Sequence, residues 1–419
     1  MLTAILSVRS LLLAVFMLMA GSGFMATLIS LQLEAAGTSP LFIGPVATAY
    51  FAGLTVGALK VTPLIQRVGH IRAFTAFVSL FSASTLTYAV HQDIMLWGAL
   101  RFVDGFCMAG VFVCLESWLN DKSGPETRGG VLAVYMTVLY SGQAVGQFLL
   151  TLSSDKPSMP FLVAGILLSL AVLPIALTRR NAPVLDEAPA MSIRKLYESS
   201  PLGIIGAAAT GMMLGAFYAL GAVHVRRLGM DLSGAALFMS VVILGGVVLQ
   251  WPIGWLSDVF DRRRVIVSTF AAAVLASGLI SLTGAPGTAL LVLGGLFGGL
   301  TFALYPLCVA HTNDRLSPAD RVGASGGLVL AYSVGAVAGP MAGAAAMSAM
   351  GPPGLYVFIA CCAIGALAFA LWRQAANMPV PGELQQHYQI LPRTTPMPAS
   401  LDPFAPDGDD DPAPDRKET

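Results

Sequence analysis

The chain contains uncharged apolar runs that are too long for the helices of a water-soluble protein. Residues 265–313 and 322–372 carry no Asp, Glu, Lys or Arg, and each run is cut once by a turn rich in glycine and proline, at Gly284–Gly287 and Gly351–Gly354. About 20 apolar residues cross a bilayer as a helix, so each run is long enough for two spans. Only 11% of the residues are charged and 56% are hydrophobic. The chain is therefore predicted to be an all-α membrane protein.

Charges and glycine–proline turns divide the chain into twelve predicted transmembrane helices. The first nine lie near residues 10–33, 41–62, 71–91, 94–119, 127–151, 159–178, 201–223, 233–256 and 264–283. One more helix follows the turn at Gly284–Gly287, and the last two are separated by the turn at Gly351–Gly354. The first run, near 10–33, is too long for the core of a signal peptide and is expected to stay as a helix.

A polar stretch in the middle of the chain separates two groups of six helices. We predict an N-terminal six-helix bundle over 1–178, a cytoplasmic linker over 179–200 and a C-terminal six-helix bundle over 201–373. Residues 374–419 are acidic and rich in proline, with too little apolar content to fold. This last stretch is predicted to be a disordered cytoplasmic tail.

The distribution of Lys and Arg predicts how the chain is oriented in the membrane. With the N-terminus inside, 18 basic residues fall in inner loops and chain ends, against three in outer loops. The inner residues are Arg9, Arg67, Arg72, Lys122, Arg128, Arg179, Arg180, Arg194, Lys195, Arg262, Arg263, Arg264, Arg315, Arg321, Arg373, Arg393, Arg416 and Lys417; the outer ones are Lys156, Arg226 and Arg227. Because basic loops stay in the cytoplasm, both termini are predicted to be cytoplasmic, in a multi-pass protein of the cell membrane.

The two halves of the chain carry a weak internal repeat. A shift of 193 residues brings several similar positions into register without a gap. The pairs are Asn120–Lys122 with Asn313–Arg315, Arg128 with Arg321, Gly142 with Gly335, and Gly146 with Gly339. The fourth and fifth helices therefore correspond to the tenth and eleventh. Two parallel six-helix repeats are predicted.

The loop after the eighth helix, GWLSDVFDRRR, carries the densest charge in the second half. With Gly254, Asp258, Arg262 and Arg263, it resembles the signature of the major facilitator superfamily between helices 8 and 9. The equivalent loop of the first half, TPLIQRVGHIR, retains Arg67 and Gly69 but has Gln66 in place of the acid. The strings QWPIGWLSD, ESWLN and VGHIRAF are similar to the YcaD-like group of bacterial facilitators. The resemblance implies the major facilitator fold and transport of a solute, and leaves the substrate open.

Two charges lie inside the fourth helix. Arg101 and Asp104 are three residues apart, on one helical face, and Gly105 completes a resemblance to a helix 4 motif of the superfamily. Charges in hydrocarbon are costly and usually face a cavity or each other. Arg101 and Asp104 are therefore candidates for substrate binding or proton coupling, with a structural ion pair as the alternative.

Three polar or aromatic side chains are further candidates for the wall of a substrate cavity. By analogy with the superfamily, Tyr218 and Tyr305 lie on helices that border the cavity, and Gln32 of the first helix is a third candidate for its wall. The alternative is that the tyrosines belong to the aromatic belts at the membrane interfaces and that Gln32 is a packing amide.

Asp258 is predicted to close an inner gate. By the symmetry of the halves, it should contact the start of the fifth helix near Thr127–Gly130, where backbone N–H groups favour a carboxylate. Glu116 is expected to contact a gate or loop residue such as Arg128. The full predicted gate set is Gly254, Asp258, Arg262, Arg263, Arg67, Gly69, Glu116, Arg128 and Arg321.

Small residues four apart predict close helix packing. These positions are Gly142, Gly146, Gly335, Gly339 and Pro340. The string GAVAGPMAG, from Gly335 to Gly343, resembles a pattern of facilitator antiporters, yet it lies on the eleventh helix rather than the fifth. It therefore does not indicate export.

The sequence shows none of the motifs of hydrolases, nucleotide-binding loops or metal sites. We therefore expect no enzyme activity, no cofactor and no metal, and the formal net charge of zero gives no reason to expect nucleic acid. The expected partners are the lipid bilayer, a small-molecule substrate and protons, and the protein is expected to be a monomer. Two hypotheses remain. The first is a secondary transporter of a small solute, driven by the proton gradient or by the solute's own gradient, and the second is a transport-inactive sensor or scaffold with this fold. The charges inside the fourth helix favour the transporter.

Overall fold

The computed structural model describes residues 8–121, 127–154, 156–177, 191–376 and 388, and contains helices but no strand within these ranges. The N-terminal group consists of α2 (Arg9–Ser22), α3 (Met25–Ala35), α4 (Pro40–Val68), α5 (His70–Val90), α6 (Ile94–Asp121), α7 (Arg128–Gln147), the 3-10 helix η1 (Phe148–Ser154) and α8 (Met159–Ala176). After the short helix α9 (Ile193–Ser199), the C-terminal group consists of α10 (Pro201–Arg227), α11 (Leu232–Val259), α12 (Arg262–Leu282), α13 (Thr288–Asn313), α14 (Pro318–Met350) and α15 (Gly354–Ala376).

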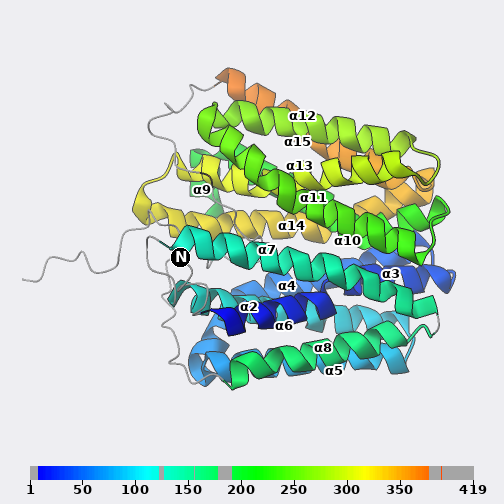
Figure 1. Cartoon of the computed structure of the whole chain (residues 1–419). Coiled ribbons are helices and arrows are strands. Elements are labelled where there is room, and N and C mark those ends of the chain that lie inside the picture. The colour runs from blue at the N-terminus through cyan, green and yellow to red at the C-terminus, as the bar shows by residue number, and fades with distance from the viewer. Residues whose placement is uncertain (1–7, 122–126, 155, 178–190, 377–387, 389–419) are drawn as a thin grey trace, which may run out of the picture.

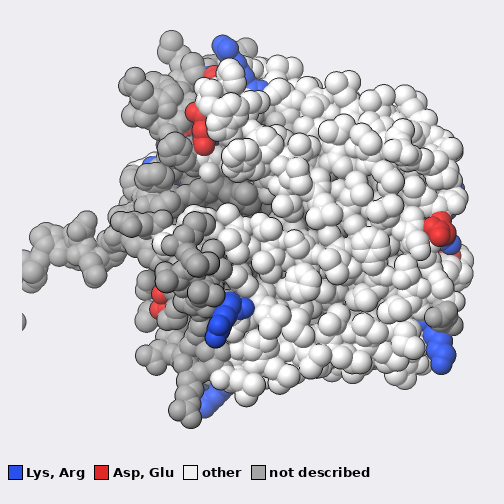
Figure 2. Space-filling model, in the orientation of Figure 1, with Lys and Arg blue, Asp and Glu red and all other residues white. Residues whose placement is uncertain are grey.

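The long helices run side by side in one bundle, and the two groups lie next to each other (Figure 1). We call the end of the bundle that carries α9 and the start of α2 the linker face, and the opposite end the far face. Charged side chains gather at these two ends and leave a broad uncharged band between them (Figure 2). Such a band matches the hydrocarbon layer of a bilayer.

Eleven of the twelve predicted spans are helices long and apolar enough to cross a membrane, among the residues described. The remaining one, α7, lies beside them in the bundle (Figure 1). It has the length of a span, 20 residues, but it carries the amides Gln143 and Gln147. The prediction of an all-α membrane protein is confirmed.

The first span differs from the prediction of one continuous helix over 10–33. It is broken after Ser22, and α3 starts at Met25. A Cβ added at Gly23 would lie 2.5 Å from the carbonyl oxygen of Met19, so glycine is required in this tight segment. The break exposes the carbonyl group of Gly23, which accepts a hydrogen bond of 3.2 Å from Nε2 of Gln147 on α7. Within a membrane such a group needs a partner from the protein.

The same backbone contact occurs in each half of the bundle. Glycines of α7 face carbonyl oxygens of α2, and glycines of α14 face carbonyl oxygens of α10. The distances from an added Cβ to these oxygens are 2.7 Å for Gly142 and Phe16, 2.4 Å for Gly146 and Ala20, 1.9 Å for Gly335 and Ala208, and 2.2 Å for Gly339 and Met212. The glycines of the two halves are related by the shift of 193 residues and their partners by a shift of 192. The internal repeat therefore extends to the partners that the sequence comparison did not include.

The end of the stretch predicted as a linker is attached to the C-terminal group. Ser192 caps α9 by accepting the N–H of Lys195, and the N–H of Met191 donates to the carbonyl oxygen of Gly323 at 3.2 Å. The Lys195 ammonium lies 3.0 Å from Oδ1 of Asp320. This contact, with a hydrogen bond from the Ser317 hydroxyl, holds the pKa of Asp320 below its usual range.

The glycine contacts predict a selective effect of added methyl groups. Gly335→Ala should lower the melting temperature of the purified protein by several degrees, because overpacking costs about 1–3 kcal/mol. Gly278→Ala on α12 is the matched control, since a Cβ there meets nothing within 4 Å. Equal melting temperatures for the two variants in the same detergent would contradict this packing role.

Candidate functional site

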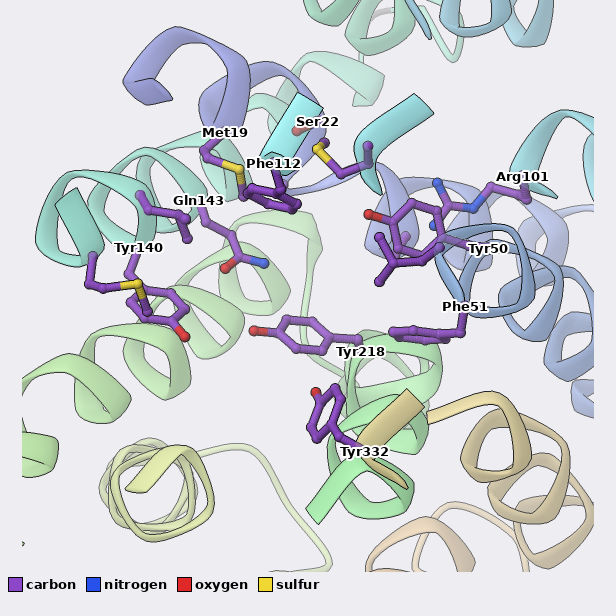
Figure 3. Close-up of a pocket in the computed structure, with 16 residues that line it drawn as sticks. Met19, Ser22, Tyr50, Phe51, Arg101, Phe112, Tyr140, Gln143, Tyr218 and Tyr332 are labelled. Carbon is purple, nitrogen blue, oxygen red and sulfur yellow. The ribbon is translucent and has the colours of Figure 1, made fainter. Parts of the chain in front are cut away.

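A cavity of about 140 Å³ lies inside the bundle between the two groups of helices. Its wall is formed by α2, α3, α4, α6 and α7 of the first group and by α10 and α14 of the second. The lining residues are Met19, Ser22, Gly23, Ala26, Tyr50, Phe51, Leu54, Arg101, Met108, Phe112, Met136, Leu139, Tyr140, Gln143, Tyr218 and Tyr332. The volume is enough for several water molecules or a small solute. We call this space the central cavity (Figure 3).

Arg101 supplies the charge in the wall of the central cavity. Its side chain is only 4% exposed. The guanidinium lies over the ring of Tyr50, 4.1 Å from the ring centre, and Nη1 is 3.6 Å from Oδ2 of Asp104. Stacking on an aromatic face and pairing with a carboxylate both stabilise a cation that is removed from water. Figure 3 shows Arg101 and Tyr50 together on one side of the cavity.

Asp104 lies next to Arg101 but does not line the central cavity. It is fully buried, and its Oδ2 accepts a hydrogen bond of 2.7 Å from the hydroxyl of Tyr88 on α5. The Tyr88 ring is stacked on Phe161 and packs edge-on against Trp97. The structure therefore brings the predicted pair together, with Arg101 in the cavity wall and Asp104 behind it.

The other predicted wall residues separate into three environments. Tyr218 lines the central cavity, where it lies opposite Tyr50 (Figure 3). Tyr305 is buried, with its ring centre 5.3 Å from that of Tyr332, so it supports the wall from behind. Gln32 lies at the far face, where it lines a separate pocket and donates a hydrogen bond to the carbonyl oxygen of Pro157. Gln32 is therefore not part of the central cavity wall.

Several wall residues were not predicted. Tyr50, Tyr140, Gln143 and Tyr332 all line the central cavity, and the ring centre of Tyr140 is 5.3 Å from that of Phe302 on α13. The available signal was the polarity of α7. Its two glutamines are costly in lipid, and such residues usually face the interior of a bundle.

A network of charges at the linker face, buried at Arg262 and Asp314, links α11, α12 and the end of α13. Nη1 of Arg262 contacts both carboxylate oxygens of Asp314, at 2.7 and 2.6 Å. Nη2 of Arg262 contacts Oδ1 of Asp258 at 3.1 Å. The side chains of Arg262 and Asp314 are 1% and 2% exposed. Arg262 therefore ties the end of α11 to the residue that follows α13.

The remaining predicted gate residues lie at the same end of the bundle. Arg67 is exposed, and Gly69 has a φ of 87°, which favours glycine at the turn between α4 and α5. Arg263 is buried and lies 3.8 Å from Asp261, the residue that caps α12. Arg321, near the start of α14, is half-buried.

Glu116 is buried in the N-terminal group and not at an open loop. Its Oε1 accepts a hydrogen bond of 3.3 Å from the hydroxyl of Tyr135 on α7. The side chain of Arg128, the partner suggested by the sequence, lies outside the described residues. Within the described part of the chain there is also no group of three or more His, Cys, Asp or Glu residues placed to hold a metal ion.

The linker-face network predicts a large loss of stability when it is broken. Arg262→Gln should leave Asp314 buried without its guanidinium, at a cost of about 3–5 kcal/mol in unfolding free energy. Arg264→Gln is the control, because Arg264 is exposed in the same arginine run. Denaturant or thermal unfolding in detergent measures both. An Arg262→Gln variant as stable as the control would show that the network does not support the fold.

The comparisons with known proteins agree over most of the chain. The model of the Major Facilitator Superfamily matches residues 11–286 and 204–404. The chain is 30% identical over 359 residues to the uncharacterized MFS-type transporter YcaD of Escherichia coli O9:H4 (strain HS), which covers 85% of this chain and 92% of the relative. It is also 30% identical over 322 residues to YcaD of Escherichia fergusonii, over 76% of this chain and 83% of that protein.

Solved structures show the same fold at lower sequence identity. The nucleoside transporter NupG has a TM-score of 0.73 at 15% identity and covers 88% of this chain and 98% of its own. A bacterial homologue of the human lysosomal transporter Spinster, inward-facing and occupied, has a TM-score of 0.71 at 16% identity over 91% of this chain and 98% of its own. The family match and the identity over most of both chains establish that this membrane transport protein belongs to the major facilitator superfamily.

Proposed function

We propose that the protein is a secondary transporter that moves a small solute across the cytoplasmic membrane by alternating access, with the central cavity as its substrate site. The observation that carries this proposal is that one cavity is lined by both groups of helices and holds a buried cation, Arg101. A site between two repeats can be opened to either side by rocking one repeat against the other. The excess of Lys and Arg in the loops supports a cytoplasmic linker face.

The contacts between the two groups support a state that is closed at the far face. Nε of Arg227 on α10 lies 2.6 Å from Oε1 of Glu34 on α3. Further from the far face but still toward it, the hydroxyl of Ser240 donates a hydrogen bond of 2.8 Å to the carbonyl oxygen of Ala144. This bond joins α11 of the C-terminal group to α7 of the N-terminal group. At the linker face, α7 and α11 instead border a cavity of about 310 Å³. The arrangement fits a transporter open toward the linker face.

The chemistry of the wall supports a substrate with an anionic group and an apolar or aromatic body. Arg101 is held by Tyr50 and Asp104, and its remaining N–H groups are available for a bidentate contact with a carboxylate or phosphate. The rings of Tyr140, Tyr218 and other aromatic residues offer flat apolar surfaces elsewhere in the cavity (Figure 3).

A thermal-shift screen tests this substrate class. Small carboxylates that bind should raise the melting temperature of the purified protein by mass action, and their neutral amide analogues should not. Arg101→Gln should weaken binding by roughly tenfold or more, since a hydrogen bond to a charged group is lost. Lys60→Gln is the control, because Lys60 is exposed and lies outside the central cavity. Equal stabilisation by acids and amides would contradict the anionic substrate class.

We further propose that Asp104 couples transport to protons. An aspartate can exchange a proton with either side, whereas an arginine keeps its own, and Asp104 is the carboxylate that pairs with the cavity arginine. A solute or a change of state that alters the pair would alter the affinity of the carboxylate for a proton.

Transport in proteoliposomes tests the role of Asp104. Asp104→Asn should abolish accumulation against a gradient under an imposed pH difference while exchange down the gradient continues. Arg101→Ala should lose both activities, and Asp93→Asn, at the exposed start of α6, should retain both. Wild-type accumulation by Asp104→Asn would leave Asp104 as a structural partner of Arg101.

A further inference from the structure

Tyr388, the residue that the structure describes beyond the last helix, contacts the signature loop of the C-terminal group. The backbone N–H of Tyr388 donates a hydrogen bond of 2.8 Å to Oδ1 of Asp258. Its ring lies against Gly254, where an added Cβ would be 2.2 Å from Cδ1 and 2.4 Å from Cε1 of the tyrosine. The glycine and the acid of the signature thus both contact Tyr388.

Tyr388 occupies a position between the two groups of helices. It lines the linker-face cavity together with Trp251, Trp255 and Asp258 of α11 and with Gly129, Leu132 and Ala133 of α7. Toward the far face the same two helices are joined directly, through Ser240 and Ala144. The ring therefore lies where α7 and α11 diverge.

We propose that Tyr388 acts as an internal ligand at the linker face. Its side chain holds the two groups of helices apart between α7 and α11 and so delays closure of this face. The proposal rests on the alternating-access function proposed above. The Tyr388 backbone donates to Oδ1 of Asp258, and Tyr388 shares one cavity with Asp258 and with Gly129 at the start of α7. Tyr388 must therefore move aside before backbone N–H groups at the start of α7 can reach this carboxylate. The ring packs against Gly254 and so holds the Tyr388 backbone beside Asp258. Without this packing the backbone leaves Asp258, which is then able to contact the start of α7. Tyr388 therefore regulates how often the transporter closes its linker face.

Distances between spin labels at the linker face test the proposal in the full-length protein. Labels at Arg72→Cys and Arg264→Cys report on the two groups, because both positions are exposed and lie outside the predicted gate set. Cys361 and Cys362, the more accessible native cysteines, are replaced by alanine. Tyr388→Ala should lower the ratio of long to short distances by roughly fivefold, at the lower end of usual coupling between two sites. Gly254→Ala should act in the same direction, because its methyl group displaces the ring.

Two further variants separate the alternatives. Tyr197→Ala removes an exposed tyrosine of α9 at the same face and should leave the distances unchanged. Glu34→Gln breaks the far-face pair with Arg227 and should shift the distances toward closure of the linker face whether or not Tyr388 is a ligand. If Glu34→Gln shifts the distances and Tyr388→Ala does not, alternating access stands and the role of Tyr388 is overturned. If no variant shifts them, both proposals fall.

Discussion

Hydrocarbon offers no hydrogen-bond partner, so each charge or broken backbone segment inside the bundle must find its partner within the protein. Arg101 meets this requirement with Tyr50 and Asp104. The carbonyl group of Gly23, exposed by the break between α2 and α3, meets it with Gln147. Gly23 and Arg101 both line the central cavity. The need to satisfy these groups therefore concentrates polar chemistry around one space between the halves, which is what a substrate site in a membrane requires.

Within each half, close contact between helix backbones holds the helices together, as apolar burial does in a soluble protein. Lipid is as apolar as leucine, so helices gain little by hiding leucine from it, and small residues that allow close packing become the main source of association. The glycines of α7 and α14 approach carbonyl oxygens of α2 and α10 at matched positions. These pairs leave no room for a methyl group, so each half is expected to move as a unit. Movement is then left to contacts between halves, such as that of Glu34 with Arg227.

Sequence patterns predicted the spans and the pairing of Arg101 with Asp104, because both depend on local features: long apolar runs, turns and helical spacing. Three aspects of the site depend on tertiary structure instead. The break at Gly23 has no proline to mark it. The positions of Gln32 and Tyr305 depend on the rotation of spans that are apolar on every side. Nothing in the sequence distinguishes Tyr50 and Tyr332 from other tyrosines within spans, and only the packing of the two halves places them in the cavity wall.

The two signature loops differ in charge, and this difference indicates which loop can control closure of the linker face. At the C-terminal loop, Arg262 contacts Asp314 through Nη1 and Asp258 through Nη2, and Oδ1 of Asp258 also accepts the N–H of Tyr388. At the N-terminal loop the equivalent position is Gln66, whose amide carries no charge for the partial positive charge at a helix start. The two loops of the repeat thus cannot respond alike. On the proposed mechanism, the charge-dependent part of closure rests on Asp258, and a single competing N–H group from Tyr388 is enough to modulate it.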